Sequence, residues 1–134
     1  MLKLIAGKKG SGKTKQLISM VNNAVETSNG KVACIEKGTK LTFDINHDAR
    51  LLNTESYCIA GYDAFYGFLA GISASDYDVK EIFVDNILQI AGDNFDEIGK
   101  LLKKIDELFG DDVSVLITIS ADESELPESV KKYL

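Results

Sequence analysis

The sequence GKKGSGKT, at residues 7–14, is the feature that most limits how this chain can fold. It matches the phosphate-binding loop pattern G-x-x-x-x-G-K-[ST] at every fixed position. Such a loop needs a strand before it and a helix after it, because the curled backbone and the free N–H groups of the first helical turn must converge on one anion. The apolar residues of the segment 2–6 predict that strand, and residues 13–27 predict the helix.

The residue types of the loop suit a nucleoside triphosphate with Mg²⁺. Backbone N–H groups from Gly10 to Thr14 are expected to hold the β-phosphate, and the Lys13 ammonium is expected to reach the β- and γ-phosphates. The Thr14 hydroxyl is expected to bind Mg²⁺ directly. The alternative is a surface turn rich in glycine and lysine that binds nothing. The loop residues predicted to contact the nucleotide are Gly7, Lys8, Lys9, Gly10, Ser11, Gly12, Lys13 and Thr14.

A second candidate metal ligand ends an apolar run further along the chain. Residues 81–88 read as a strand of the kind that is buried on both faces of a parallel sheet. Within it, residues 82–85 are three apolar side chains followed by Asp85, whose carboxylate is expected to hold the Mg²⁺ through water. The alternative is an acid that merely ends a strand in solvent.

The residue that would orient a water for hydrolysis is less well defined. Asn86 follows Asp85 and cannot accept a proton. Glu36, at the end of a predicted strand over residues 31–36, is the candidate catalytic carboxylate, and a surface acid at a strand end is the alternative. Thr118 and Ser120, at the end of the last strand, are candidate γ-phosphate sensors, although polar spacing on a buried strand explains them equally well.

The remaining patterns alternate between helix and strand over residues 1–134 and predict one α/β domain with a mainly parallel sheet. The first strand and the strand over residues 31–36 are expected to pair in parallel. Apolar periodicity predicts helices over residues 61–74 and from a cap at residues 93–94 to about residue 109. Residues 113–120 read as a buried strand, and Pro127 is expected to open a short helix. Residues 41–59 are expected to form a hairpin or meander at the sheet edge.

Composition narrows the function further. The chain has 21 acidic and 15 basic residues and a net charge of -6, which argues against a general nucleic-acid-binding surface. Cys34 and Cys58 lie in apolar runs and are expected to be buried, reduced thiols. His47 is expected to be a turn residue. No apolar run is long enough to cross a membrane and no signal peptide is evident, so we expect a cytoplasmic location and no membrane partner.

The two motifs and the order of elements resemble the P-loop NTPase superfamily on its RecA/ASCE-like side, with residues 7–14 as Walker A and residues 82–85 as Walker B. The whole chain is similar to small bacterial single-domain ATP-binding proteins, some of them labelled twitching-motility-ATPase-like. The resemblance implies a three-layer fold with helices on both faces of the sheet, and a water-activating role at Glu36. True twitching-motility ATPases are longer and carry several arginines, whereas Arg50 is the only arginine here.

These observations predict a Mg-ATP-binding protein with slow ATPase activity, which a protein partner or self-association is expected to raise. A slow rate is expected because arginine fingers raise such rates by about 10³–10⁵ and the chain offers only Arg50. The guanine signature N-K-x-D is missing, which favours ATP over GTP. Two alternatives stay open. One is a nucleotide sensor without turnover, and the other is a small-molecule phosphotransferase that uses the aromatic residues of the segment 62–72 as an acceptor wall.

Overall fold

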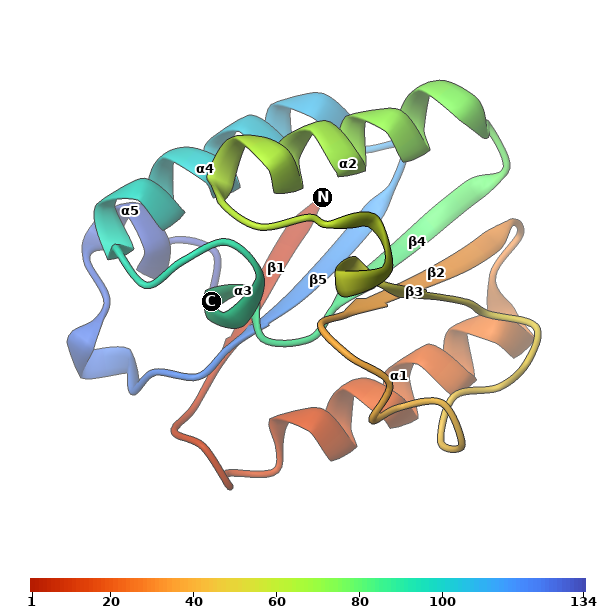
Figure 1. Ribbon diagram of the computed structural model, residues 1–134, viewed down its shortest axis with the longest axis horizontal. Helices are drawn as coiled ribbons and strands as arrows, with labels where there is room; N and C mark the ends of the chain where they lie inside the picture. The colour runs from red at the N-terminus through yellow and green to blue at the C-terminus, as the bar shows by residue number, and fades with distance from the viewer.

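Five parallel strands form one sheet in the computed structural model, which describes residues 1–134 (Figure 1). The order of the strands in the sheet is β1-β5-β4-β2-β3, so β1 and β3 are the two edges. The strands are β1 (Leu2–Ala6), β2 (Lys31–Glu36), β3 (Arg50–Asn53), β4 (Val79–Val84) and β5 (Ser114–Ile119).

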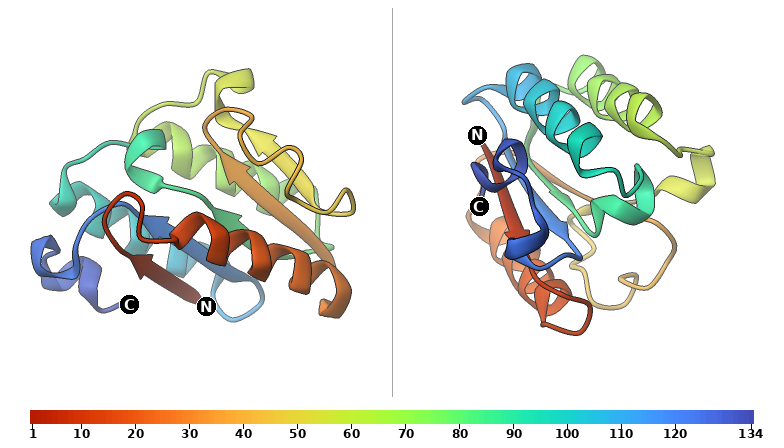
Figure 2. Two further views of the ribbon diagram at one scale, coloured as in Figure 1. Left: turned by 90° about the horizontal axis from the view of Figure 1, so that it is seen from below. Right: turned by 90° about the vertical axis from the view of Figure 1, so that its left-hand side faces the viewer.

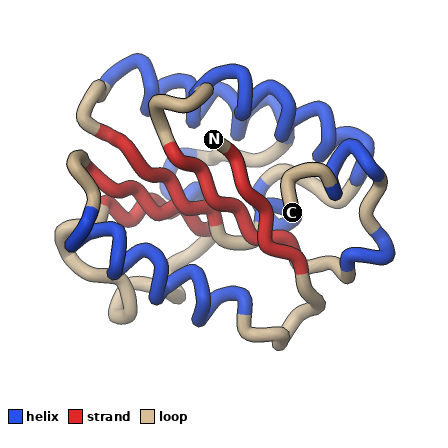
Figure 3. The backbone as a smooth tube through the Cα atoms, turned by 180° about the vertical axis from the view of Figure 1, so that it is seen from behind, coloured by secondary structure: helices blue, strands red, loops and turns tan.

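Helices lie on both sides of this sheet, with α1 on one side and α2 and α4 on the other (Figures 2 and 3). None of the helices has the length and the apolar character needed to cross a bilayer. The helices are α1 (Lys13–Thr27), α2 (Tyr62–Ser75), α3 (Ile87–Ile90), α4 (Phe95–Phe109) and α5 (Glu128–Lys131), with 3₁₀ turns η1 (Thr54–Tyr57) and η2 (Glu123–Glu125).

Each face of the sheet has its own apolar core. Leu17 and Val21 of α1 pack with Phe83 and Leu116 on one face, and α2 and α4 cover a larger cluster on the other. Cys34 is buried in the smaller cluster, as predicted, and burial raises the pKa of its thiol to about 12. The alternation of strand side chains between the two faces therefore accounts for both helical layers.

The strand order corrects one expectation. β1 and β2 run parallel but do not pair, because β5 and β4 lie between them. Burial explains the difference: β4 and β5 carry apolar side chains on both faces, and only central positions cover both. The order places the C-terminal ends of β1, β5 and β4 side by side, at the end of the sheet where the parallel strands finish.

The expected hairpin or meander over residues 41–59 is wrong, although residues 50–53 do form the edge strand β3, which pairs in parallel with β2. Leu41 and Ile45 are buried against α1, and the Ile45 N–H donates to the Leu41 carbonyl at 3.1 Å, so residues 41–45 turn instead of extending. Phe43 between them is 98% exposed. The four-residue spacing of the buried side chains fits one face of a turn, and the alternation of apolar and polar residues hid it. His47 lies in a turn, as predicted.

Two further details differ from the prediction. Cys58 is exposed because residues 54–57 form the turn η1, and Cys58 ends it with a φ of 56°. The expected strand over residues 81–88 stops at Val84, and Ile87 and Ile90 are buried on the short helix α3. Residues three positions apart lie on the same face of a helical turn, so α3 buries both isoleucines as well as the expected strand would.

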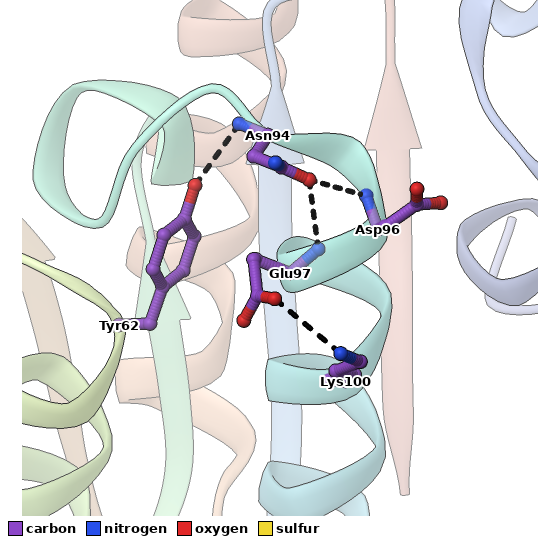
Figure 4. A network of polar contacts seen from close by, with 5 residues as sticks. All are labelled: Tyr62, Asn94, Asp96, Glu97 and Lys100. Atoms are coloured by element: carbon purple, nitrogen blue, oxygen red, sulfur yellow. Dashed lines mark hydrogen bonds and ion pairs between the residues drawn. The ribbon is translucent and has the colours of Figure 1, made fainter.

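The start of α4 is tied to the start of α2 by a chain of polar contacts (Figure 4). The Asn94 side chain accepts hydrogen bonds from the N–H groups of Asp96 at 3.0 Å and Glu97 at 3.2 Å, as the predicted cap requires. The Asn94 N–H donates to the Tyr62 hydroxyl at 2.9 Å, and Lys100 pairs with Glu97 at 3.4 Å. These contacts fix the register of α4 against α2.

We predict that Asn94→Ala lowers the free energy of unfolding by about 1 kcal/mol, because two helical N–H groups lose their acceptor. Urea denaturation should show a lower midpoint with an unchanged slope. Asn94→Asp is the matched control, since its carboxylate accepts the same hydrogen bonds, and it should unfold close to the native midpoint. An alanine variant as stable as the native chain would contradict the assigned cap.

Candidate functional site

The predicted phosphate-binding loop connects the C-terminal end of β1 to α1. Gly10 and Gly12 have φ values of 87° and 91°, which lie in the left-handed region that favours glycine. A Cβ at either position would meet no atom within 4 Å, so backbone conformation and not crowding requires glycine there. The Gly7 N–H donates to the Ile119 carbonyl at 3.3 Å, which anchors the loop to the end of β5.

The backbone N–H groups of this loop are largely free. Ser11 N–H donates to the Lys8 carbonyl at 3.0 Å, and the Gln16 N–H begins the hydrogen-bond pattern of α1 by donating to Gly12 at 3.1 Å. The N–H groups of the four residues between Ser11 and Gln16 donate to no acceptor of the chain. Free donors at the N-terminus of a 15-residue helix are suited to binding an anion. The free N–H groups belong to Gly12, Lys13, Thr14 and Lys15.

Lys13 places its ammonium inside the loop. The residue is only 8% exposed, and its Nζ donates to the Lys8 carbonyl at 3.1 Å. Burial lowers the pKa of the Lys13 ammonium, and the negative charge of Asp85 partly offsets that effect. A partly desolvated cation whose contact within the loop is a neutral carbonyl is well suited to pair with a phosphate oxygen.

Residues from three elements meet beside this cation. The Thr14 hydroxyl of α1 donates to the Asp85 carboxylate at 3.3 Å, and the Thr118 hydroxyl of β5 donates to the same oxygen at 3.2 Å. The Asp85 N–H donates to the Ile35 carbonyl of β2 at 2.9 Å. The structure therefore brings together Thr14 and Asp85, which are far apart in sequence. A hydroxyl and a carboxylate side by side are the oxygen ligands that Mg²⁺ prefers.

Thr118 orients Asp85 and not a phosphate. Its side chain is fully buried, and its hydroxyl both donates to Asp85 and accepts the Asn86 N–H at 2.8 Å. With its donor and an acceptor site in use, this hydroxyl is not free for the γ-phosphate sensing suggested above. The sequence shows that a polar residue stands at this position of β5, but only the pairing of β5 with β4 shows that its hydroxyl faces Asp85.

Asn86 occupies a strained position next to the candidate metal ligand. Its φ is 57°, which asparagine tolerates better than most residues, and its buried Oδ1 has no hydrogen-bond partner. An unpaired buried acceptor costs free energy that the rest of the fold must offset. The strain and the unpaired oxygen both lie at the end of β4, one residue beyond Asp85.

Glu36 is more enclosed than the sequence suggested. It is 2% exposed, and its Oε2 accepts the Leu41 N–H at 3.1 Å. Burial raises the pKa of the Glu36 carboxyl, the Leu41 N–H partly offsets this, and the charge of Asp85 adds to the increase. The pairing of Ile35 with Val84 puts Glu36 and Asp85 next to each other at the ends of β2 and β4. The carboxylate thus anchors the loop after β2 and borders the candidate site.

Three other residues of the loop, Lys8, Lys9 and Ser11, are exposed. Arg50 begins β3. Because all five strands are parallel, it lies at the end of the sheet where the strands begin, opposite the end that carries the phosphate-binding loop. The only arginine of the chain therefore cannot reach a phosphate held by its own loop.

No family model matches the sequence, and no curated protein matches it. Among solved structures, the crystal structure of flagellar accessory protein FlaH from Methanocaldococcus jannaschii is similar, with a TM-score of 0.62 and 17% sequence identity. The alignment covers 98% of this chain and 65% of that chain. This likeness shows the fold alone, a mixed α/β fold around a parallel sheet that is consistent with a RecA-like arrangement.

We predict that Thr118→Val lowers the free energy of unfolding by about 1–3 kcal/mol, because the partly buried Asn86 N–H loses its acceptor, the fully buried Thr118 hydroxyl, while the side-chain shape is kept. Chemical denaturation measures the change. Thr118→Ser is the control: it retains the hydroxyl and should recover most of the difference. A valine variant as stable as the native chain would show that this hydroxyl does not hold the end of β4.

Proposed function

We propose that this chain has the three-layer P-loop NTPase fold and binds a nucleoside triphosphate, most simply ATP, together with Mg²⁺. The observation that carries the proposal is the set of free N–H groups from Gly12 to Lys15 around the buried Lys13 ammonium. Free N–H groups in the first turn of a helix, together with a partly desolvated cation, are suited to binding an anion. The adjacent Thr14 and Asp85 oxygens supply the complementary cation site.

Each residue then has a defined task. The loop N–H groups and Lys13 would hold the β- and γ-phosphates, and Thr14 and Asp85 would hold the metal. A bound Mg²⁺ would neutralise charge on the phosphate oxygens. Thr118 keeps the Asp85 carboxylate turned toward Thr14. A cytoplasmic location, inferred from the two free thiols, is part of the same proposal.

For activity, we propose slow hydrolysis with Glu36 as the residue that orients water. Its place beside Asp85 supports this role. No arginine of the same chain can add transition-state stabilisation, because Arg50 lies where the strands begin and the phosphate-binding loop lies where they end. Such groups contribute about 10³–10⁵ in rate where they are present, so the isolated chain should turn over slowly.

One observation favours a nucleotide sensor without turnover as the second candidate. The Glu36 carboxylate is enclosed and engaged with the Leu41 N–H, and the residue after Asp85 is an asparagine that cannot accept a proton. Nothing in the structure favours phosphotransfer. The α2 residues Phe65 and Leu69 are buried in the core, as the packing alternative for this helix requires.

We predict that Lys13→Ala weakens Mg-ATP binding by about 10- to 150-fold, since a charge-assisted hydrogen bond is worth about 1.5–3 kcal/mol. Isothermal titration calorimetry of native and variant protein with Mg-ATP and Mg-GTP measures the loss. Lys103→Ala is the matched control, because it removes an exposed lysine that lies on α4 and outside the loop, and it should bind within a few-fold of the native affinity. Absence of heat and of any melting shift for the native chain would overturn the proposal.

We predict that Glu36→Gln lowers phosphate release by about 10²-fold or more while ATP affinity is retained. The amide still accepts the Leu41 N–H, so the variant should fold normally. Because the pKa of Glu36 is raised, the native chain should lose stability as the pH rises through the folded pKa, and the glutamine variant should not. Native phosphate release no higher than that of Lys13→Ala would select the sensor.

A further inference from the structure

The two edges of the sheet are finished differently. On the outer edge of β1, the Leu4 N–H donates to the Tyr133 carbonyl at 2.8 Å, so the C-terminal segment covers that edge. On the other edge, β3 pairs only with β2. An open groove of about 900 Å³ lies there between β3 and α2, and Leu51, Phe68 and Ile72 contribute apolar surface to it. The groove is remote from the phosphate-binding loop, which leaves the opposite edge strand.

The helix that borders this groove contains two glycines without a role in the chain's own packing. Gly67 and Gly71 are exposed interior residues of α2 and line the groove. Glycine in a helix interior costs about 1 kcal/mol relative to alanine. A Cβ at either position would meet no atom within 4 Å, and neither residue has the positive φ that requires glycine. Their cost is therefore not offset by anything within the isolated chain.

Glycines at this spacing flatten one face of α2, which extends to the exposed Ala64 and Ala74. A flat, apolar helical surface allows the backbone of another helix to approach closely. Beside it, Tyr57 is 54% exposed, although its ring packs on Phe68 with 5.8 Å between the ring centroids. An apolar surface of this kind gains free energy when another surface covers it.

Charges at the two ends of α2 are complementary to each other. Asp63 lies in the first turn and has no ion-pair partner. Arg50 borders the groove near the other end of the helix, beside the ion pair of Lys31 with Asp76, and it is also unpaired. If a second α2 lies antiparallel to the first, the acidic end of each helix meets the arginine-containing end of the other.

We propose that the groove and the exposed face of α2 form the interface of a homodimer, in which a second copy of this chain packs its α2 antiparallel across Gly67 and Gly71. A two-fold axis makes such a contact self-complementary, so that each copy contributes the same surface. The proposal does not rest on nucleotide binding, because the interface uses the edge strand farthest from β1.

The size of the surface sets the expected affinity. A helix of 14 residues is about 21 Å long, so α2 and the groove beside it offer several hundred Å² on each copy, below the roughly 800 Å² of a standard interface. The dimer should therefore be weak, with a dissociation constant on the order of 1–100 μM.

Sedimentation velocity over a concentration series tests the proposal with a variant whose folding is not at risk. Gly67→Ala with Gly71→Ala should raise the melting temperature measured under monomeric conditions, because helix propensity improves and nothing clashes. The same variant should weaken dimerisation at least tenfold. Ser73→Ala is the matched control: it also improves helix propensity, but it lies outside the groove and should leave dimerisation unchanged.

Charge exchange provides the second test. Asp63→Arg or Arg50→Asp alone should weaken the dimer at low salt, and the two together should restore it, because a two-fold axis brings the exchanged charges back into register. A native chain that stays monomeric at about 1 mM would overturn the proposal. So would a dimer that the double alanine variant forms as well as the native chain. Native dimerisation together with loss in the alanine variant, with or without nucleotide, would support it.

Discussion

The candidate site depends on the position of β5 between β1 and β4. Ala6 at the end of β1 pairs with Ile119, and Val84 at the end of β4 pairs with Ile117. The phosphate-binding loop and Asp85 therefore both follow the C-terminal ends of their strands, with only β5 between them. Thr118 lies between them and holds the Asp85 carboxylate. A register shift of one residue would turn this hydroxyl to the other face of the sheet and leave the carboxylate unsupported.

Local signals in the sequence were sufficient for the part of the fold that carries the loop. The helix predicted over residues 13–27 and the strand over residues 31–36 have the bounds of α1 and β2. Glycines in the loop and periodic apolar residues in the helix act within a few positions of each other, so neighbouring residues decide the structure. The Asn94 cap was found for the same reason, because its acceptor serves the next two N–H groups along the chain beyond Phe95.

Contacts between distant residues decided the rest. Leu41 and Ile45 form a turn because α1 buries them, whereas a strand would place Phe43 on the same buried face as both, and Phe43 is 98% exposed. Strand order has no local signal, so the role of Thr118 could not be assigned before β5 was placed beside β4. For the same reason the sequence identified Glu36 as a strand-end acid, but its burial and its bond to Leu41 follow from the path of the loop. The predictions for Lys13, Thr14 and Asp85 as ligands remain predictions, now with a geometry that suits them.

Glycine serves two purposes in this chain, and the contrast separates its two candidate surfaces. Gly10 and Gly12 have backbone conformations that favour glycine, whereas Gly67 and Gly71 have ordinary helical conformations and open space around them. The first pair shapes a site within the chain, and the second pair is explained by a neighbour outside it. Since the second surface lies along β3, a dimer formed there keeps Arg50 at the end of the sheet where the strands begin. Such a dimer would not supply the missing arginine to either phosphate-binding loop, so stimulated hydrolysis would need a different partner.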